Sequence, residues 1–452
     1  MDERIEELEI LIKQLLEDKK YFDIRELLVD MNEADIAEII ESFEEKTDVV
    51  RIFRLLPKDN AAEVFSYIPV EYEQMIIESI TTREINFIMN ELFTDDAADM
   101  LEEMPANVVK RVLAATDPET RKEINGLLKY PDSSAGSVMA VEYVSLRTTM
   151  SVLEAIQKIR QVGAEKETIN VCYVTDVQKH LLGIVTLKDI IMASENDNIG
   201  ELMDENVITC HTLDDQEEVA RQFQKYDFSA MPVVDNENRL VGIITVDDVM
   251  DIMEEEATED IEMMAAITPT DTPYMKTSVF ETYGKRIPWL LILMISASIT
   301  GKIIEGFEAG LASCVILTAF IPMLMNTGGS CGSQASVSVI RALSLDEVEF
   351  KDIFKILGKE FTVSLVIGAT LAIANFAKML MFDHVTITIA LVVCLTLFFT
   401  SVIAELAGCA LPVIASKLGF DPAVMASPFI TTIVDAMSLV IYFNIASRLL
   451  GL

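Results

Sequence analysis

Five long apolar stretches after residue 284 constrain this chain more than any other feature. They run over 288–304, 311–341, 361–382, 385–411 and 422–450. A helix that crosses a bilayer needs about 20 predominantly apolar residues. The sequence therefore predicts a transmembrane domain of five helices over 284–452.

The remainder of the chain is strongly acidic. The whole sequence of 452 residues has a formal net charge of −38, and residues 1–283 alone hold 62 acidic and 25 basic residues, a net −37. Such a surface argues against nucleic acid as a partner, because phosphate binding needs a basic face. It favours cations. An acidic soluble half is joined to a nearly neutral membrane half.

Several classes of site are absent from the sequence. The six cysteines show no CxxC spacing and there are only three histidines, so a zinc site or a disulfide framework is not expected. No GxxxxGK loop, HExxH motif or Ser-His-Asp set is found, which argues against an enzyme. The charged start MDERIEELEI does not have the pattern of a signal peptide.

The acidic half has an internal organisation. Residues 1–130 show apolar residues at helical spacing and are expected to form an all-α N-domain. Residues 131–253 contain two similar α/β units that mix β-branched runs with amphipathic helices. Gly183, Thr186 and Asp189 recur 59 positions later as Gly242, Thr245 and Asp248. Residues 254–283 are expected to form a charged connecting helix.

The basic residues that flank the apolar stretches predict the orientation of the membrane domain. Seven lie on the side of the N-terminus and three on the other side, namely Lys302, Lys378 and Arg448. This bias places the acidic half in the cytoplasm of a multi-pass protein of the cell membrane, with the C-terminus outside.

The second apolar stretch contains helix-breaking residues, FIPMLMNTGGSCGSQ. Unwound backbone at membrane depth is tolerated only where it lines a cavity or is buried in protein, and freed carbonyl groups there suit a cation. Close packing of helices through small residues is the alternative. We expect a broken helix and a pore lined by Pro322, Asn326, Gly328, Gly329, Gly332 and Gln334.

Two carboxylates lie within the apolar stretches. Asp435 stands at the centre of SPFITTIVDAMSLVIYF, where a charge is costly unless it faces water or a partner. We therefore expect Asp435 to face the water-filled interior. Glu405, in the fourth stretch, is open to two interpretations, a functional carboxylate or one near the membrane edge that reaches water.

The paired α/β units resemble a tandem cystathionine-β-synthase (CBS) domain pair, on the strength of the cores GIVTLKD and GIITVDD. This resemblance implies a regulatory module that can hold an adenine nucleotide such as ATP, with Thr186 and Asp189 as ribose contacts. The other interpretation is that these two residues only form a turn and a helix cap after a strand.

The whole chain resembles the MgtE magnesium channel family. The motifs are PWLL in the first span, FIPMLMNTGGSCGSQ in the second, SLDEVEFKDI in the following loop, and DPAVMASPFITTIVD leading into Asp435. Two positions depart from the family pattern, namely Ser330, where an asparagine is common, and Ser438, where a glycine is common. Both concern the detailed geometry of the pore.

The resemblance implies roles for particular residues. Asp435 would hold hydrated Mg²⁺, one carboxylate from each chain of a homodimer, with Thr431 among the pore-lining residues. Cytosolic Mg²⁺ would be sensed between the N-domain, the CBS pair and a connecting "plug" helix that faces the start of the fifth span. The implied sensor residues are Glu63, Asp95, Asp99, Asp227, Asp248, Asp251, Glu256, Glu259, Asp260 and Asp421.

Two functions from different classes follow. The first is a Mg²⁺ channel or transporter that imports Mg²⁺ and is closed by cytosolic Mg²⁺. The second is a membrane-anchored CBS sensor of nucleotide or Mg²⁺ that transports nothing. Asp435 and the helix-breaking second stretch favour the first, because an anchor needs neither.

Overall fold

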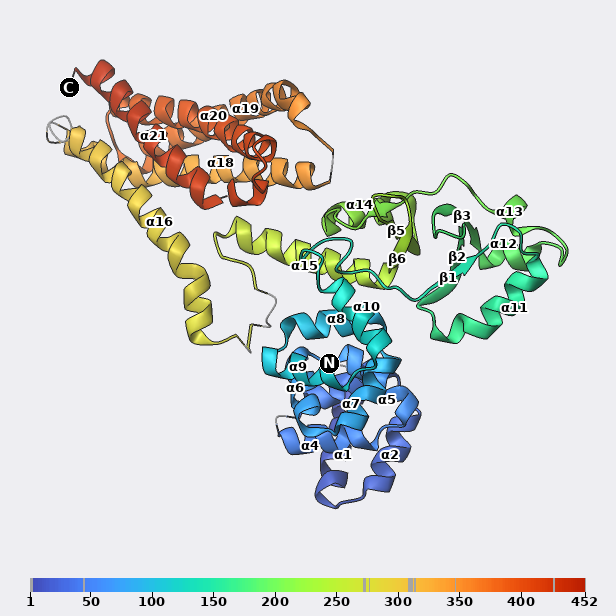
Figure 1. Cartoon of the computed structure of the whole chain (residues 1–452). Helices are drawn as coiled ribbons and strands as arrows, with labels where there is room; N and C mark the ends of the chain where they lie inside the picture. Colours follow the sequence, from blue (N-terminus) through green and yellow to red (C-terminus); the bar gives the residue numbers. More distant parts are fainter. Residues whose placement is uncertain are drawn as a thin grey trace. The chain divides into compact units, whose positions relative to one another are not determined.

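The computed structural model of the chain describes residues 3–43, 45–270, 274–275, 277–307, 312, 314–345, 347–425 and 427–451. The chain divides into two compact units, Met1–Met253 and Glu254–Leu452 (Figure 1). Each unit is described by itself.

The N-terminal part of the first unit is all-helical, as predicted. Its described helices are α1 (Glu3–Glu17), α2 (Tyr21–Val29), α3 (Glu33–Glu41), α4 (Lys46–Leu55), α5 (Lys58–Tyr67), α6 (Val70–Ser79), α7 (Thr82–Glu91), α8 (Thr94–Glu103), α9 (Ala106–Ala115) and α10 (Pro118–Leu127). Pro57, Pro69 and Pro105 stand at the N-caps of α5, α6 and α9, where a residue without an N–H does not interrupt the helical hydrogen bonds. The apolar faces of these helices share one core, rich in isoleucine.

The two α/β units each form a three-stranded sheet. In the first, β1 (Tyr143–Leu146) lies parallel to β2 (Thr168–Thr175), and β2 pairs antiparallel with β3 (Leu181–Thr186). The second repeats this order with β4 (Cys210–His211), β5 (Ala230–Val234) and β6 (Leu240–Thr245). The helices of these units are α11 (Val152–Val162), α12 (Leu187–Met192), α13 (Ile199–Leu202) and α14 (Gln216–Tyr226).

The sheets of the two units share a buried core. Tyr173 of β2 and Ile243 of β6 belong to the same apolar cluster, and both are fully buried. The constant 59-residue offset therefore corresponds to a structural repeat, and the predicted CBS-type pair is confirmed as a fold.

The connecting segment differs from the expected helix over 254–283. The helix α15 runs over Val246–Met264, so it begins earlier and ends earlier, and α16 begins only at Val279. Pro269 lies in the non-helical part, where its ring and missing N–H prevent helix continuation. This part is attached to α16: the Lys285 ammonium donates to the Pro269 carbonyl at 2.5 Å, and the Trp289 indole donates to Thr268 at 3.2 Å.

The second unit contains five apolar helical segments long enough to cross a membrane, as predicted. They run over Val279–Gly306, Val315–Ser344, Phe350–Asp383, Ile387–Lys417 and Pro422–Leu450. Their α-helices are α16 (Val279–Gly306), α18 (Ile321–Ser344), α19 (Ile353–Lys378), α20 (Ile387–Lys417) and α21 (Ser427–Leu450). The helix α20 is the most deeply buried of the five, because α18, α19 and α21 all pack against it (Figure 1).

Candidate functional site

A pocket of about 380 Å³ in the first unit gathers carboxylates from segments that are distant in sequence. The helical N-domain contributes residues of α3, α5, α7 and α8, and the paired α/β units contribute Glu167 and the start of α15. Its acidic lining residues are Glu33, Glu63, Glu91, Asp95, Asp96, Glu167, Asp247, Asp248 and Asp251.

Local structure fixes the central carboxylates. Asp95 and Asp96 lie in the first turn of α8, and Asp247 and Asp248 lie in the first turn of α15. The partial positive charge at a helix N-terminus favours carboxylates at such positions. Asp248 is also held from β6, because the Thr245 hydroxyl donates to its carboxylate at 2.7 Å.

These carboxylates perturb one another. Burial, followed by the charge of Asp248, raises the pKa of Asp96 to about 7 and that of Glu167 to about 8. The same two causes hold the pKa of Asp95 well above its ordinary range. Burial also raises the pKa of Asp248 to about 6. The pocket therefore opposes full ionisation of its own side chains.

In the part of the chain that the structure describes, the four central carboxylates, Asp95, Asp96, Glu167 and Asp248, have no salt bridge that would offset this repulsion. The same part of the chain contains no group of three or more His, Cys, Asp or Glu side chains gathered closely enough to hold a metal ion as they stand. The pocket is thus an acidic cavity with several carboxylates around its wall.

Most of the implied sensor residues of the first unit come together here. Glu63, Asp95, Asp248 and Asp251 line the pocket, and the charge of Asp251 acts on Asp99, whose pKa is raised mainly by burial. Asp227 is an exception: it is exposed at the C-cap of α14, with a left-handed backbone φ of 54°, and does not line the pocket.

Sequence reasoning missed six carboxylates of this region, two of which are Glu33 and Glu91 in the lining of the pocket. Asp96, Glu167 and Asp247 line the pocket, and Glu73 on α6 is 5% exposed, with a pKa raised to about 9 by burial and by Asp99 of α8. Asp96 and Asp247 adjoin residues that were identified, so adjacency was a usable signal. Nothing in the sequence distinguishes Glu167 or Glu73 from surface residues.

Thr186 and Asp189 form a helix cap. The Thr186 hydroxyl accepts the backbone N–H of Asp189 at 3.1 Å, and the Asp189 carboxylate accepts the backbone N–H of Thr186 at 3.3 Å, so together they close the start of α12. Thr245 and Asp248 repeat the arrangement at α15. Both side chains of the first pair are accessible at the edge of the sheet.

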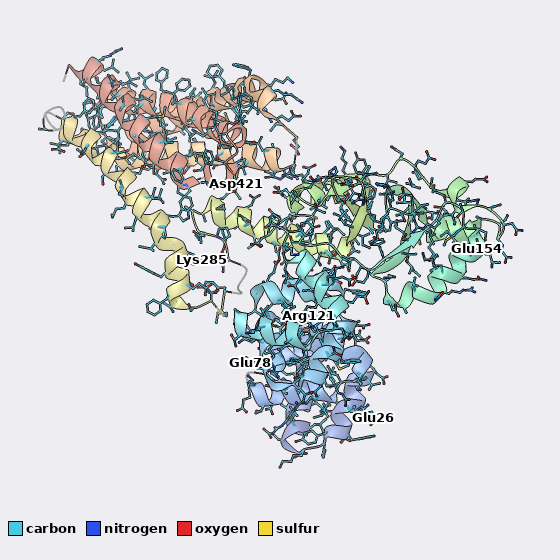
Figure 2. All side chains as sticks on the ribbon, viewed as in Figure 1. Glu26, Glu78, Arg121, Glu154, Lys285 and Asp421 are labelled. Carbon is cyan, nitrogen blue, oxygen red and sulfur yellow. The ribbon has the colours of Figure 1, made fainter. Side chains whose placement is uncertain are left out.

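The acidic residues of the connecting helix lie in the second unit. Glu256, Glu259 and Asp260 stand on the C-terminal half of α15. The end of this helix packs on the membrane helices, because Met263 and Met264 contact the cluster of Ile340 and Ala423. Asp421, at the turn between α20 and α21 (Figure 2), accepts the backbone N–H of Ala423 at 2.8 Å.

The expected break in the second span is wrong. The helix α18 is continuous from Ile321 through the glycines, and Pro322 lies in its first turn, where proline is tolerated. A Cβ added to Gly328 would lie 2.7 Å from Thr400 and 3.0 Å from Val434, and one added to Gly332 would lie 2.7 Å from Ile430. The glycines therefore allow close helix packing, the alternative considered above.

A polar stripe runs along the opposite face of α18. Pro322, Asn326, Ser330 and Gln334 recur every four residues, and all four are exposed in the chain. Residues four apart lie on one helix face. Asn326 and Gln334 thus occupy a different face from Gly328 and Gly332, which are buried against α20 and α21.

Asp435 lies midway along α21. It is half-buried, and its Oδ1 atom is buried without a hydrogen-bond partner within the described residues. Thr431, one turn earlier, lies against Gly329 of α18, at 3.0 Å from a Cβ built on that glycine. An unsatisfied carboxylate oxygen inside an apolar helix bundle is costly unless a cation or water reaches it.

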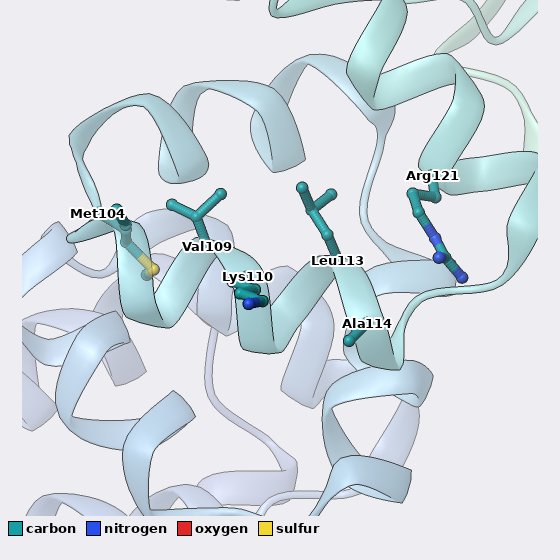
Figure 3. A pocket seen from close by; sticks show the side chains of 7 residues that line it. Met104, Val109, Lys110, Leu113, Ala114 and Arg121 are labelled. Atoms are coloured by element: carbon teal, nitrogen blue, oxygen red, sulfur yellow. The ribbon is translucent and has the colours of Figure 1, made fainter.

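A second depression lacks this chemistry. About 550 Å³ of space lies along α9 and α10, and its lining residues in Figure 3, such as Val109, Leu113 and Arg121, are apolar or basic. Its described lining residues include no carboxylate, the side chain that a hard cation prefers.

Comparison with known proteins matches three parts of the chain to family profiles. Residues 321–445 match a profile described as "MgtE: Divalent cation transporter", residues 31–133 match the "MgtE intracellular N domain", and residues 135–196 and 199–255 match the CBS domain.

Curated relatives extend the match over most of the chain. The magnesium transporter MgtE of Thermus thermophilus is 36% identical over 405 residues, 88% of this chain and 89% of that protein. The magnesium transporter MgtE of Bacillus subtilis is 34% identical over 412 residues, 88% of this chain and 91% of that protein.

Two solved structures resemble the soluble half. A crystal structure of the soluble part of a magnesium transporter has a TM-score of 0.52 and 30% identity, and covers 56% of this chain and 99% of that one. The cytosolic domain of the Mg²⁺ channel MgtE in complex with ATP has a TM-score of 0.51 and 35% identity, and covers 54% of this chain and 99% of that one.

Proposed function

The chain belongs to the MgtE family of divalent cation transporters, and from this premise we propose that it imports Mg²⁺ across the cell membrane along a path that passes Asp435. We further propose that Mg²⁺ on the side of the acidic domain closes this path. The main observation in favour of transport is that the buried Oδ1 atom of Asp435, within an apolar helix, has no hydrogen-bond partner among the described residues.

The membrane unit supports a water-filled path. Mg²⁺ gives up its water slowly and is bound by one or two carboxylates with water completing the octahedron. The exposed stripe of Asn326, Ser330 and Gln334 provides polar groups on one face of a membrane helix, which lipid tails would not solvate. A homodimer that brings two such faces together would enclose the path and supply two copies of Asp435.

Transport is tested by flux into proteoliposomes with a Mg²⁺-sensitive dye inside. Asp435→Ala and Asp435→Asn should abolish the flux, because water cannot replace a negative charge at low dielectric. Asp383→Asn is the matched control, since Asp383 lies at the end of the third apolar segment in a salt bridge with Lys378. Wild-type flux from folded Asp435→Ala protein would exclude this pore and leave a sensor without transport.

The acidic pocket supports the proposed gate. Its carboxylates come both from the helical N-domain and from the start of α15, and the central ones repel one another. Mg²⁺ with its waters would bridge them and offset that repulsion. Because α15 continues to Met263 and Met264 at the membrane helices, a change at Asp248 and Asp251 has a direct covalent route to the membrane unit.

Glu256, Glu259, Asp260 and Asp421 remain proposed ligands of the same regulatory Mg²⁺ system. They belong to the second unit, where the end of α15 contacts the turn that holds Asp421. Asp227 is proposed to take part only with a change of its surroundings, since it is exposed at a helix end.

The gate is tested on the full chain. Replacing Asp95, Asp99, Asp248 and Asp251 by Asn should leave transport intact and weaken the block of flux by Mg²⁺ on the acidic-domain side by about tenfold or more. Asp18→Asn with Asp30→Asn is the control, because both residues are in the N-domain and outside the pocket. An unchanged block in the fourfold variant would contradict the proposed sensor.

We also propose that the CBS pair binds ATP through Thr186 and Asp189. A related cytosolic domain was solved in complex with ATP, and the cap formed by these residues leaves their side chains accessible. A cap and a ribose contact are compatible, because a carboxylate has two oxygens and accepts more than one hydrogen bond.

The orientation remains a proposal from the basic residues. Lys351 lies just before α19 and Lys355 lies in its first turn. Lys417 ends α20 with its ammonium over the ring of Phe350, so these three residues belong to one edge of the membrane unit. This edge is proposed to be cytoplasmic, and the C-terminus is proposed to lie outside.

A further inference from the structure

Glu405 is buried inside the membrane unit. It lies on α20, is 3% exposed, and its Oε2 atom has no hydrogen-bond partner within the described residues. This burial does not agree with one of the two interpretations above, that Glu405 reaches water near the membrane edge. A carboxylate in such a place is costly unless a partner offsets its charge.

A second carboxylate, Glu360, lies near Glu405 in the membrane unit. Ile356 of α19 and Cys409 of α20 share a buried apolar cluster, and further along the two antiparallel helices Asn375 donates to Cys394. Glu360 lies one turn after Ile356 and Glu405 one turn before Cys409, so the two carboxylates stand at the same level of the packed helix pair. Neither glutamate forms a salt bridge among the described residues. Glu360 is half-exposed, so the pair has one buried and one accessible member.

The pair lies close to the Asp435 helix. Ala404, next to Glu405, shares a small apolar cluster with Cys331 of α18 and Val434 of α21. Val434 immediately precedes Asp435 in sequence. The helix of Glu405 therefore packs against the helix of Asp435 at the level of these two carboxylates.

We propose that Glu405 and Glu360 form a second divalent-cation subsite in the membrane unit, occupied in turn with Asp435. This inference rests on the proposed transport function. Mg²⁺ needs only one or two carboxylates when water completes its shell, which matches a pair rather than a closed cage. The half-exposed Glu360 is the point of entry, and the buried Glu405 carboxylate is the inner ligand.

The flux of Mg²⁺ against its concentration tests the subsite. Glu405→Gln and Glu360→Gln should each raise the half-saturating Mg²⁺ concentration by about tenfold while flux at saturation stays above half of wild type. Glu405→Asp, which keeps the charge, should recover most of the loss. Glu305→Gln is the control, because Glu305 is exposed in the last turn of α16. Asp435→Asn, in contrast, should abolish flux at every concentration, so failure of the subsite and failure of transport are distinguishable.

A spectroscopic measurement separates ligation from a packing role. Infrared difference spectra of the full chain, with Mg²⁺ minus with EDTA, are recorded for wild type and for Glu360→Gln. The bands of the Glu360 carboxylate are those present in the wild type and missing in Glu360→Gln. In the wild type these bands should shift when millimolar Mg²⁺ is added, and in the Asp435→Asn variant they should shift in the same way. Bands that do not respond to Mg²⁺, or unchanged half-saturation in both Gln variants, would overturn the proposal. If Glu405→Gln does not fold, Glu360→Gln alone decides it.

Discussion

Replacing Gly408 by alanine tests how α18 and α20 are held together. A Cβ built on Gly408 would lie 2.9 Å from the carbonyl carbon of Gly332 and 3.0 Å from its Cα, and nearer still to the carbonyl oxygen. Carbon atoms in good contact are about 3.5–4.0 Å apart. The obstacle is backbone, which cannot rotate away as a side chain can, so the two helices must separate by roughly 0.5–1 Å.

The cost follows from this separation. Overpacking of a well-packed interior costs about 1–3 kcal/mol, and we expect the upper part of that range because backbone must move. The shift also displaces Gly328 and Gly329 from α21, next to Asp435. We therefore expect Gly408→Ala to lower both the thermal stability of the full chain in detergent and its Mg²⁺ flux.

Gly358→Ala is the matched control. Gly358 lies in α19, and an added Cβ there meets nothing within 4 Å. Alanine should be neutral or stabilising at that position by up to about 1 kcal/mol, because it favours helix more than glycine does. Thermal unfolding followed by Trp289 fluorescence compares the two variants. Equal stability of Gly408→Ala and Gly358→Ala would refute the packing account of the glycine face.

Three further outcomes are expected. Burial raises the pKa of Asp96 to about 7, of Glu167 to about 8 and of Glu73 to about 9, so the folded state binds more protons than the unfolded state above about pH 4. In EDTA, thermal stability should therefore fall as pH rises from 6 to 9, and a flat or rising curve would contradict these shifts. Because these carboxylates are partly protonated, Mg²⁺ must displace protons when it binds. The Mg²⁺ concentration that halves the flux should therefore be lower at pH 8.5 than at pH 6.5, which is measured as flux at stepped Mg²⁺ concentrations on the side of the acidic domain. Calorimetry with ATP should register binding that Asp189→Ala removes and Asp197→Ala retains; no heat with wild type would leave the CBS pair without that ligand.

The broad architecture was predictable because it follows from patterns of composition. Length and hydropathy alone predict five spans, and the 59-residue recurrence of Gly183, Thr186 and Asp189 predicts two equivalent sheets. The helical N-domain follows from periodic apolar residues. The spans and the helices depend on local sequence, which a short window reveals, and the two sheets follow from comparing two such windows 59 residues apart.

The errors arise where tertiary packing decides. Proline and glycines predict an interrupted second span, yet α18 stays helical because Pro322 falls in its first turn and the glycines face α20 and α21. The connecting helix ends at Met264 rather than 283, and Pro269 lies in the non-helical part that follows. Local composition does not predict which helix a glycine will pack against.

The candidate site was only partly predictable for the same reason. Asp95 and Asp248 were identified through a family resemblance, whereas Glu167 and Glu73 resemble surface residues in sequence and are enclosed only by the folded N-domain and sheets. Glu405 is buried because of how α20 packs between its neighbours, which hydropathy does not encode.

The most direct test of the account is Mg²⁺ flux through the full chain in proteoliposomes, with Mg²⁺ stepped on the side of the acidic domain. Wild type should conduct when that side holds EDTA and close at millimolar Mg²⁺, while Na⁺ at equal ionic strength should not close it, because monovalent ions screen charge but do not bridge carboxylates. The variant with Asn at 95, 99, 248 and 251 should stay open at the same Mg²⁺ concentration. Flux that is absent in EDTA, or that is insensitive to Mg²⁺ on that side in the wild type, would contradict a cation-gated Mg²⁺ pathway.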